Sequence, residues 1–252
     1  MRRTVLHILF AVTCACTAFA QTAPDEFERG NAFYRDGKYD QAALSYESIL
    51  NQGLASPSLY FNIGNCYYRM GKIAPAILAY ERALRLQPND ADIKHNLELV
   101  NFKTLDRIEP LPELFFIVWL RSFSAVVPLY TTARLFAACW LLLFAGLSLL
   151  YLLANSALLR FLRGVAIAAA IALIPLAIVL VTQVIDSRNR TDAVITASVL
   201  TAKTSPDPQS LDAFVAHEGL KVKLSDAVGE WMKIVLPDGK VGWIRSQDCE
   251  RI

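Results

Sequence analysis

The sequence predicts a multi-domain fold with three parts: an all-α helical repeat, a two-helix transmembrane hairpin and an all-β domain folded as a small barrel. Three observations lead to this prediction. A pattern of aromatic and small residues recurs near the N-terminus, two long uncharged apolar stretches follow it, and short alternating runs with turn residues occupy residues 193–252. The length of 252 residues is enough for two modest soluble domains beside a membrane segment.

The composition supports membrane segments and gives no sign of nucleic-acid binding. Apolar residues make up 54% of the chain, which is high for a soluble protein, and the excess is concentrated in its central part. The net charge is +2 and no long run of one sign occurs, so no general basic surface for nucleic acid is expected. The cysteines show no CxxC spacing, so neither a disulfide framework nor a redox site is indicated.

Residues 1–20 are typical of a signal peptide. Arg2 and Arg3 give a positive start, a short apolar core follows, and Ala18-Phe19-Ala20 matches the small-x-small pattern at which such peptides are cleaved. An uncleaved anchor helix is the alternative, for which the apolar stretch is short. We expect the mature chain to begin at Gln21 and to be exported.

A 34-residue repeat follows and is the strongest pattern in the sequence. The matched pairs are Gly30 and Gly64, Asn31 and Asn65, Tyr34 and Tyr68, Arg35 and Arg69, Gly37 and Gly71, Ala42 and Ala76, Tyr46 and Tyr80, and Leu50 and Leu84. This pattern resembles the tetratricopeptide repeat (TPR) family, and the resemblance implies two antiparallel helices in each copy. The prediction is a TPR module over residues 21–105, with two repeats and a capping helix.

Small and aromatic residues have separate packing roles in such a module. Gly30 and Gly64 let the two helices of a repeat approach closely, and Tyr46 and Tyr80 fill the space towards the next repeat. Each repeat leaves an apolar face uncovered, so about three units are needed for stability. Apolar residues recur on one face of residues 89–103, which are therefore expected to form the capping helix.

The central part is expected to interact with a membrane. Residues 106–134 combine prolines with scattered aromatic residues and are predicted to be a linker followed by a segment at the membrane surface. A third span over residues 113–134 is the alternative, which Arg121 in its middle disfavours. Two uncharged runs, residues 135–154 and 164–185, are each long enough to cross a hydrocarbon core of about 30 Å. A short loop over residues 155–163 joins them. Gly164, Ala168 and Ala172 are predicted to pack the second span on the first.

The signal peptide sets the expected orientation. An exported TPR module followed by two spans places the loop over residues 155–163 in the cytoplasm and returns the C-terminal domain to the side of the repeats. The prediction is a multi-pass protein of the bacterial inner membrane, with both soluble parts in the periplasm. Arginines near several span ends support this orientation only weakly.

Residues 193–252 predict a small all-β domain. Short alternating runs, several turn signals and a tight hairpin at Pro237-Asp238-Gly239-Lys240 are consistent with about five strands in a barrel. His217-Glu218-Gly219, Trp231 and Gly242-Trp243-Ile244 resemble the bacterial SH3 family, so an SH3-like barrel is expected. Trp231 and Trp243 are expected to serve in strand packing more than in ligand binding.

The order of the parts adds a further resemblance. A signal peptide, a short TPR array, a membrane hairpin and an SH3-like domain together resemble the BatE-like family of bacterial Bat (aerotolerance) operons. The resemblance implies partners with von Willebrand A-type domains and a MoxR-type ATPase.

No reaction chemistry is indicated, so the protein is not expected to be an enzyme. Phosphate-binding, dinucleotide-binding and nucleophile-elbow motifs do not occur in the sequence. His95 and His217 have no Cys, Asp or Glu at ligand spacing, so both are expected at the surface and no metal or cofactor is predicted.

The candidate functional residues lie on the first helix of each repeat, which lines the concave groove in TPR arrays. The first copy contributes Phe27, Asn31, Tyr34 and Arg35, and the second contributes Phe61, Asn65, Tyr68 and Arg69. Amide, aromatic and guanidinium groups are suited to binding a peptide, but a recent duplication would also leave the same residues in both copies. The favoured function is a membrane-anchored scaffold for protein partners. The alternative is a cell-wall tether or sensor whose SH3-like domain binds peptidoglycan.

Overall fold

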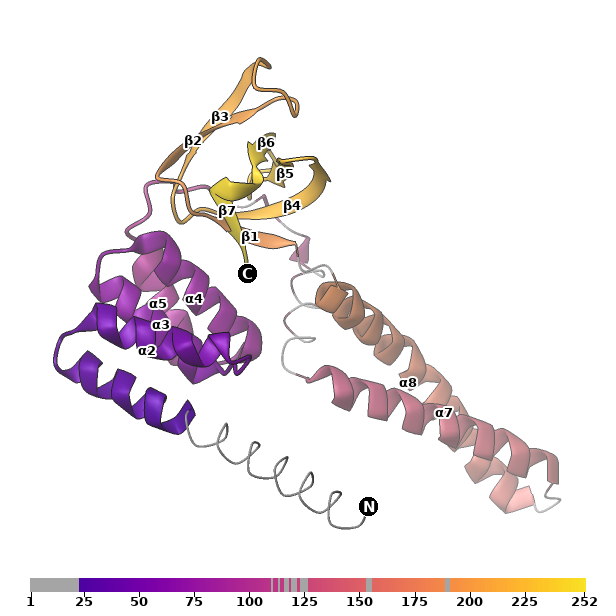
Figure 1. Ribbon diagram of the computed structural model, residues 1–252. Helices are drawn as coiled ribbons and strands as arrows, with labels where there is room; N and C mark the ends of the chain where they lie inside the picture. The colour runs from indigo at the N-terminus through magenta and orange to yellow at the C-terminus, as the bar shows by residue number, and fades with distance from the viewer. Residues whose placement is uncertain are drawn as a thin grey trace, which may run out of the picture. The chain divides into compact units, whose positions relative to one another are not determined.

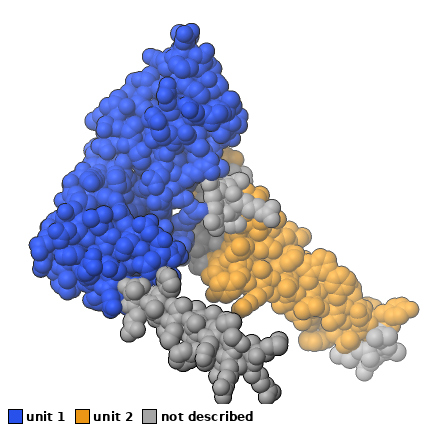
Figure 2. All heavy atoms as spheres, in the orientation of Figure 1, with its two compact units in different colours: residues 1–111, 191–252 blue, residues 112–190 orange. Residues whose placement is uncertain are grey.

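The computed structural model describes residues 23–109, 111–112, 114–115, 118, 122, 127–152, 156–188 and 191–252. The predicted signal peptide lies outside these residues, as does most of the predicted segment at the membrane surface. The chain divides into two compact units, one from Met1–Leu111 and Thr191–Ile252 and the other from Pro112–Arg190 (Figure 2). The first unit holds the helical repeats and a β-sheet, and the second holds two apolar helices.

The repeats are built from consecutive helices joined by short turns (Figure 1). These are a helix over residues 23–35, α2 (Tyr39–Asn51), α3 (Pro57–Arg69), α4 (Ile73–Leu86) and α5 (Ala91–Asn101). The start of α3 is fixed by Ser56, whose side chain accepts a hydrogen bond from the Leu59 N–H at 3.1 Å. Asp90 caps α5 by accepting from the Asp92 and Ile93 N–H groups. Such caps satisfy N–H groups that have no partner inside the helix.

Close helix packing depends on the two glycines that the repeat pattern singled out. A Cβ at Gly30 would lie 2.6 Å from the Tyr46 ring, and a Cβ at Gly64 would lie 2.7 Å from the Tyr80 ring. Both tyrosines are 1% exposed, so neither ring has room to move aside. On α5, Ile93, Leu97 and Val100 join the buried cluster of α4. The predicted helical repeats and their capping helix are therefore present.

The second unit contains α7 (Leu129–Leu152) and α8 (Ser156–Arg188). Within them, Leu129–Tyr151 and Leu159–Ile185 are long and apolar enough to cross a membrane. Residues 156–163, predicted as part of a loop, belong to α8.

The contact between α7 and α8 uses different small residues from those predicted. A Cβ at Gly146 would lie 3.5 Å from the Ala166 Cβ, whereas a Cβ at Gly164 would have nothing within 4 Å. Ala166 and Ala169 are buried, while Ala168 is exposed. The predicted stripe of Gly164, Ala168 and Ala172 was therefore wrong, because a spacing of small residues does not determine which face of α8 meets α7.

The C-terminal part forms an antiparallel sheet of seven strands among the described residues. In chain order they are β1 (Asp192–Ile195), β2 (Val199–Lys203), β3 (Asp212–His217), β4 (Lys221–Val228), β5 (Trp231–Val235), β6 (Val241–Arg245) and β7 (Cys249–Arg251). Their order in the sheet is β3-β2-β6-β5-β4-β1-β7, with β3 and β7 at the edges. The prediction of an all-β domain is confirmed. The sheet is not closed, so the predicted SH3-like barrel is not confirmed.

Alternation along the strands places one face of the sheet in a core. Buried side chains occupy every second position of β2 and of the first half of β4. Within the sheet, the largest fully buried side chains are those of Ile195, Ile234 and Ile244. The predicted hairpin joins β5 to β6, where the Leu236 N–H donates to the Lys240 carbonyl at 2.9 Å.

Apolar contacts join the repeats to the sheet within the first unit. Val194 of β1 is fully buried in the cluster formed by α4 and α5, and Ile252 packs against the same cluster. The turn before β4 approaches closely, since a Cβ at Gly219 would lie 2.9 Å from side-chain atoms of Ile77 and Thr104. Gly219 also has φ +86°, which side chains disfavour, so a glycine is required here for two reasons.

Polar contacts surround this apolar junction. Arg82 of α4 donates to the Glu250 carboxylate and to the Arg251 carbonyl, both at 2.8 Å. The Lys221 ammonium of β4 donates to Glu81 at 2.8 Å and lies 3.5 Å from Asp192. Burial disfavours the ammonium of Lys221, but Glu81 and Asp192 outweigh burial and raise its pKa above the ordinary value. The repeats and the sheet are thus joined by a core and by charge pairs.

The segment predicted as a linker takes part in the same unit. Ile108 packs against the core of the sheet, and the Leu111 N–H donates to the Pro237 carbonyl at 3.1 Å. Asp106 accepts a hydrogen bond from the His217 N–H at 2.7 Å and lies 2.8 Å from Nδ1 of the same residue. His217 was expected at the surface but is half-buried, because Asp106 comes to it from a distant part of the sequence.

Candidate protein-binding groove

An aromatic and amide cluster lies on the first repeat. The Tyr46 hydroxyl donates to Asn31 Oδ1 at 2.7 Å, and the Asn62 side chain of the next repeat also hydrogen-bonds to Tyr46. The Phe27 ring packs on Tyr46 with 5.5 Å between centroids. Asn31 and Phe27 of the first helix are therefore held in place by Tyr46, a fully buried side chain of α2.

The second repeat builds the same cluster. The Tyr80 hydroxyl donates to Asn65 Oδ1 at 2.7 Å, and the Asn96 amide donates to the same oxygen at 3.0 Å. The Phe61 ring lies 5.8 Å from the Tyr80 ring. Tyr46 and Tyr80, like Asn62 and Asn96, are 34 residues apart, so the whole unit recurs with the repeat.

The two buried hydroxyls remain hydrogen-bond donors over a wide pH range. Burial raises the pKa of Tyr46 to about 12, with smaller contributions from Cys66 and Tyr34. Burial also raises the pKa of Tyr80 well above its ordinary value, and a hydrogen bond with Asn96 acts in the opposite direction. Each hydroxyl donates to an asparagine oxygen, and the Asn31 amide donates to Glu28 Oε1 at 3.5 Å. A side-chain amide has two N–H groups, so Asn31 and Asn65 can each still donate to a ligand carbonyl.

Cations from one repeat lie on aromatic rings of the repeat before it. The Arg69 guanidinium lies 4.8 Å from the centre of the Tyr39 ring and also hydrogen-bonds to Tyr34, and the Lys103 ammonium lies 4.4 Å from the centre of the Tyr68 ring. Such contacts hold a cation in place and contribute about 0.5 to 2 kcal/mol. Arg35, on the first helix, is exposed. The two predicted arginines are therefore not equivalent.

A hollow opens near the N-terminal ends of α3 and α5. It has a volume of about 260 Å³, and Phe61, Asn62, Asp90 and Asp92 contribute to its lining. Arg35, Arg69 and Lys103 lie at the opposite ends of their helices. The first-helix surface therefore carries acidic groups at one end and basic groups at the other.

Sequence reasoning missed Asn62 and Asn96 as members of this surface. The signal was present, because the two asparagines are separated by the same 34 residues as the pairs that were recognised. Each contacts a tyrosine of the preceding repeat, so the relation crosses a repeat boundary and is not visible when the copies are compared one with the other.

The outward face of the sheet carries the two tryptophans. Trp231 pairs with Arg245 across β5 and β6, and Lys233 pairs with Trp243, so each indole lies beside a cation at 5.9 Å from its centre. Both indoles are half-buried and pack along the strands, as expected. A hollow of about 250 Å³ adjoins Trp231, and Lys203, Pro208 and Arg245 also line it.

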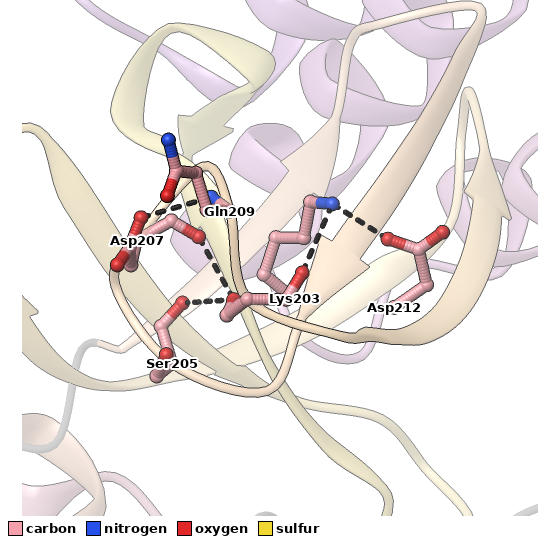
Figure 3. A network of polar contacts seen from close by, with 6 residues as sticks. Lys203, Ser205, Asp207, Gln209 and Asp212 are labelled. Carbon is pink, nitrogen blue, oxygen red and sulfur yellow. Dashed lines mark hydrogen bonds and ion pairs between the residues drawn. The ribbon is translucent and has the colours of Figure 1, made fainter.

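Hydrogen bonds fix the loop that borders this hollow (Figure 3). The Gln209 N–H donates to Asp207 Oδ1 at 2.8 Å, and the Ser210 hydroxyl donates to the Asp207 carbonyl at 2.8 Å. Lys203 of β2 donates to Asp212 of β3 at 2.6 Å, which ties the two sides of the loop together. Pro208 is thereby held at the edge of the hollow beside Trp231.

Comparison with known proteins identifies the repeat. Residues 57–90 match the tetratricopeptide repeat family, and this range spans α3 and α4. No curated protein matches the chain. Among solved structures, the chain is similar to the first TPR of Spaghetti (RPAP3) bound to the HSP90 peptide SRMEEVD. The identity is 23%, the match covers 32% of this chain and 92% of that one, and the TM-score is 0.23.

Proposed function

We propose that this chain is a membrane-anchored scaffold whose repeats bind a segment of a partner protein. TPR repeats generally mediate protein interactions, and residues 57–90 match that family. The observation that carries the proposal is a recurring unit in which one Phe and two Asn from the first helices of successive repeats surround one buried Tyr from a second helix. Two such units in series offer alternating apolar rings and amide groups, which suit an extended peptide backbone.

The charges on this surface suggest the orientation and chemistry of the ligand. Arg35 is exposed and free to pair with a carboxylate, while Asp90 and Asp92 flank the hollow at the other end. A segment with acidic residues at one end and a basic residue at the other would match both. Tyr34, Tyr68 and Arg69 would contribute ring faces and a fixed positive charge at the basic end.

The groove proposal is tested by reversing one exposed charge. In Arg35→Glu the guanidinium is replaced by a carboxylate, so capture of an acidic segment should fall by roughly tenfold or more. Arg29→Glu is the matched control, because Arg29 lies on the same helix with 60% of its side chain exposed and pairs with Glu26. Capture would be measured by co-purification of von Willebrand A-type and MoxR-type proteins from crosslinked membranes. Equal losses in both variants, or no loss in Arg35→Glu, would count against the groove.

We infer that α7 and α8 form the membrane anchor and that both soluble parts lie in the periplasm. The proposal is supported by the length and apolar composition of the two helices. Alkaline phosphatase is active only outside the cytoplasm, so fusions after Lys103 and after Ile252 should be active and a fusion after Leu159 inactive. Activity at only one of the first two positions would contradict two spans. The association with a Bat-type complex is part of the same proposal and rests on the order of the parts.

The alternative function is a peptidoglycan-binding tether that uses an SH3-like domain. It is favoured by the hollow beside Trp231, which combines an aromatic surface with Lys203 and Arg245. Purified full-length protein in detergent should then sediment with isolated peptidoglycan, and Trp231→Ala should reduce the bound fraction. Trp243→Ala is the matched control, because Trp243 does not line this hollow. Absence of sedimentation would leave the scaffold function alone.

A further inference from the structure

Helix α5 occupies the position of the first helix of a third repeat. The α3 residues that face α4, each increased by 34, give the corresponding α5 residues. These are Tyr60, Ile63, Gly64 and Tyr67 on α3, and Lys94, Leu97, Glu98 and Asn101 on α5. On α3 all four are buried or half-buried, whereas Lys94, Glu98 and Asn101 on α5 are exposed. The face that α4 covers in the second repeat is therefore open in the third.

This open face forms one wall of a large hollow, named here the third-repeat groove. Its volume is about 670 Å³, and all four α5 residues line it. Arg107, Ile108 and Glu109 from the segment after α5, with Leu220 from the sheet, line the opposite side. Phe102 also lines the groove and is 62% exposed, although it is a large aromatic side chain. Among the residues that the structure describes, no helix covers this face, because residues 104–109, which follow α5, are not helical.

The charges of the third-repeat groove have a regular arrangement. Lys94 and Glu98 stand on the α5 side, and Arg107 and Glu109 stand on the other side. Both sides therefore offer one cation and one anion above an apolar floor that includes Leu97 and Leu220. A ligand that satisfies both sides needs an apolar ridge flanked by charges of both signs, which is the pattern of an amphipathic helix.

The glycine position of the repeat also limits the ligand. In the first two repeats the covering helix places Tyr46 or Tyr80 against Gly30 or Gly64. In α5 the equivalent residue is Glu98, whose side chain leaves no place for a tyrosine ring but offers a carboxylate. The covering helix of a partner would therefore carry a small or basic residue at this point.

We propose that the third-repeat groove binds an amphipathic α-helix of a partner protein, antiparallel to α5, which completes the third repeat. Such a helix would take the place that α2 and α4 have in the first two repeats. This surface is separate from the groove of the proposed function, which uses Arg35 and the asparagine clusters. The chain would then hold two partner segments, or two parts of one partner, at the same time.

The proposal is tested by site-specific photo-crosslinking of the full-length protein in its native membrane. A photoreactive phenylalanine analogue would replace Lys94 in one variant and Asn101 in another, with Asp40, exposed on α2, as the control position. Mass spectrometry would identify the attachment sites. Because Lys94 and Asn101 are two helical turns apart, their attachment sites should lie about seven residues apart in one partner segment and in reverse order. The proposal would be overturned by attachment to a second copy of this chain, to residues 112–190 or to lipid. It would also be overturned if the two attachment sites were only two residues apart, or if the yields were no higher than at Asp40.

Charge variants make the assignment sharper and separate it from the proposed function. Glu98→Arg should lower the crosslinking yield from Asn101 by roughly tenfold, because it places a cation against the basic residue expected in the ligand. Arg35→Glu should leave this yield unchanged, whatever it does to capture at the first groove. An unchanged crosslinking yield from Asn101 in Glu98→Arg would overturn the proposal that a partner helix with a small or basic residue binds here. A lower yield in Arg35→Glu would show that the two surfaces form one binding site.

Discussion

The junction between the repeats and the sheet makes a quantitative prediction about Val194. This side chain is fully buried in the core of α4 and α5, although it belongs to β1. Val194→Ala removes two methyl groups, which costs about 1.6 kcal/mol in transfer free energy, and the remaining cavity adds to this cost. The free energy of unfolding of the first unit should therefore fall by about 2–3 kcal/mol.

The assay is hydrogen exchange followed by mass spectrometry on the full-length protein in detergent. A loss of about 2–3 kcal/mol corresponds to roughly 30-fold to 150-fold faster exchange at amides that open only by global unfolding. The acceleration should appear in α4 and α5 as well as in β1 and β4, because these elements share the core around Val194. Val199→Ala is the matched control, since Val199 is 62% exposed and its loss should change stability by no more than about 0.5 kcal/mol.

The pattern of exchange decides whether the reasoning is right. Faster exchange confined to the strands, with α4 and α5 unchanged, would mean that the repeats fold independently of the sheet. Equal effects of Val194→Ala and Val199→Ala would mean that the burial of Val194 has no energetic weight. Either result would refute a shared core.

Three further predictions concern single side chains. Gly64→Ala should lower the free energy of unfolding by about 1–3 kcal/mol, because its Cβ would lie 2.7 Å from the buried Tyr80 ring. Gly164→Ala is the control, since its Cβ would have nothing within 4 Å, and it should not lower the temperature of thermal unfolding. The pKa of Tyr46 is about 12 in the folded protein and 10.0 ordinarily, so the unfolded chain loses this proton first and stability should fall as the pH rises above about 10. Tyr46→Phe should reduce the amplitude of the late phenolate step in an ultraviolet titration without abolishing it, because the pKa of Tyr80 is raised as well, and a titration identical to wild type would contradict the assignment. Asp106→Asn weakens both contacts to His217, so urea unfolding should show that the free energy of unfolding of the first unit falls by about 1–3 kcal/mol. Asp212 is 66% exposed, so the control Asp212→Asn should change this free energy by no more than about 0.5 kcal/mol.

The helical repeats were predictable because their pattern is local and periodic. Gly64 and Tyr80 lie in one repeat, and the close approach of their two helices is a consequence of the spacing alone. The apolar helices were predictable for a similar reason, since length and composition are properties of a continuous segment. Periodicity could not decide how Asn31 and Asn65 are used, because an internal bond to tyrosine and a bond to a ligand leave the same recurrence in the sequence.

Contacts between distant parts of the chain were outside the reach of pattern reasoning. Glu81 and Lys221 form a pair across 140 residues, and nothing near either residue in the sequence indicates the other. The strand alternation fixed which face of the sheet is buried but not whether β3 meets β7, so closure into a barrel could not be derived from it. The hydrogen bonds of Asp106 to His217 could not be predicted for the same reason. Asp106 lies between the end of α5 and two prolines, a sequence context that is typical of a linker.

The shared core has a consequence for the proposed topology. Residues 112–190 are inserted between two segments that together build one compact unit. Val194 can lie in the core of the repeats only if the chain on both sides of the insertion is in the same compartment. A single span would place the repeats and β1 on opposite sides of the membrane, so Val194 could not reach the core of α4 and α5, whereas two spans return the chain to the same side. The packing of β1 on α4 therefore argues for an even number of spans independently of any signal peptide, and the fusions after Lys103 and Ile252 should agree with each other even if the orientation is reversed.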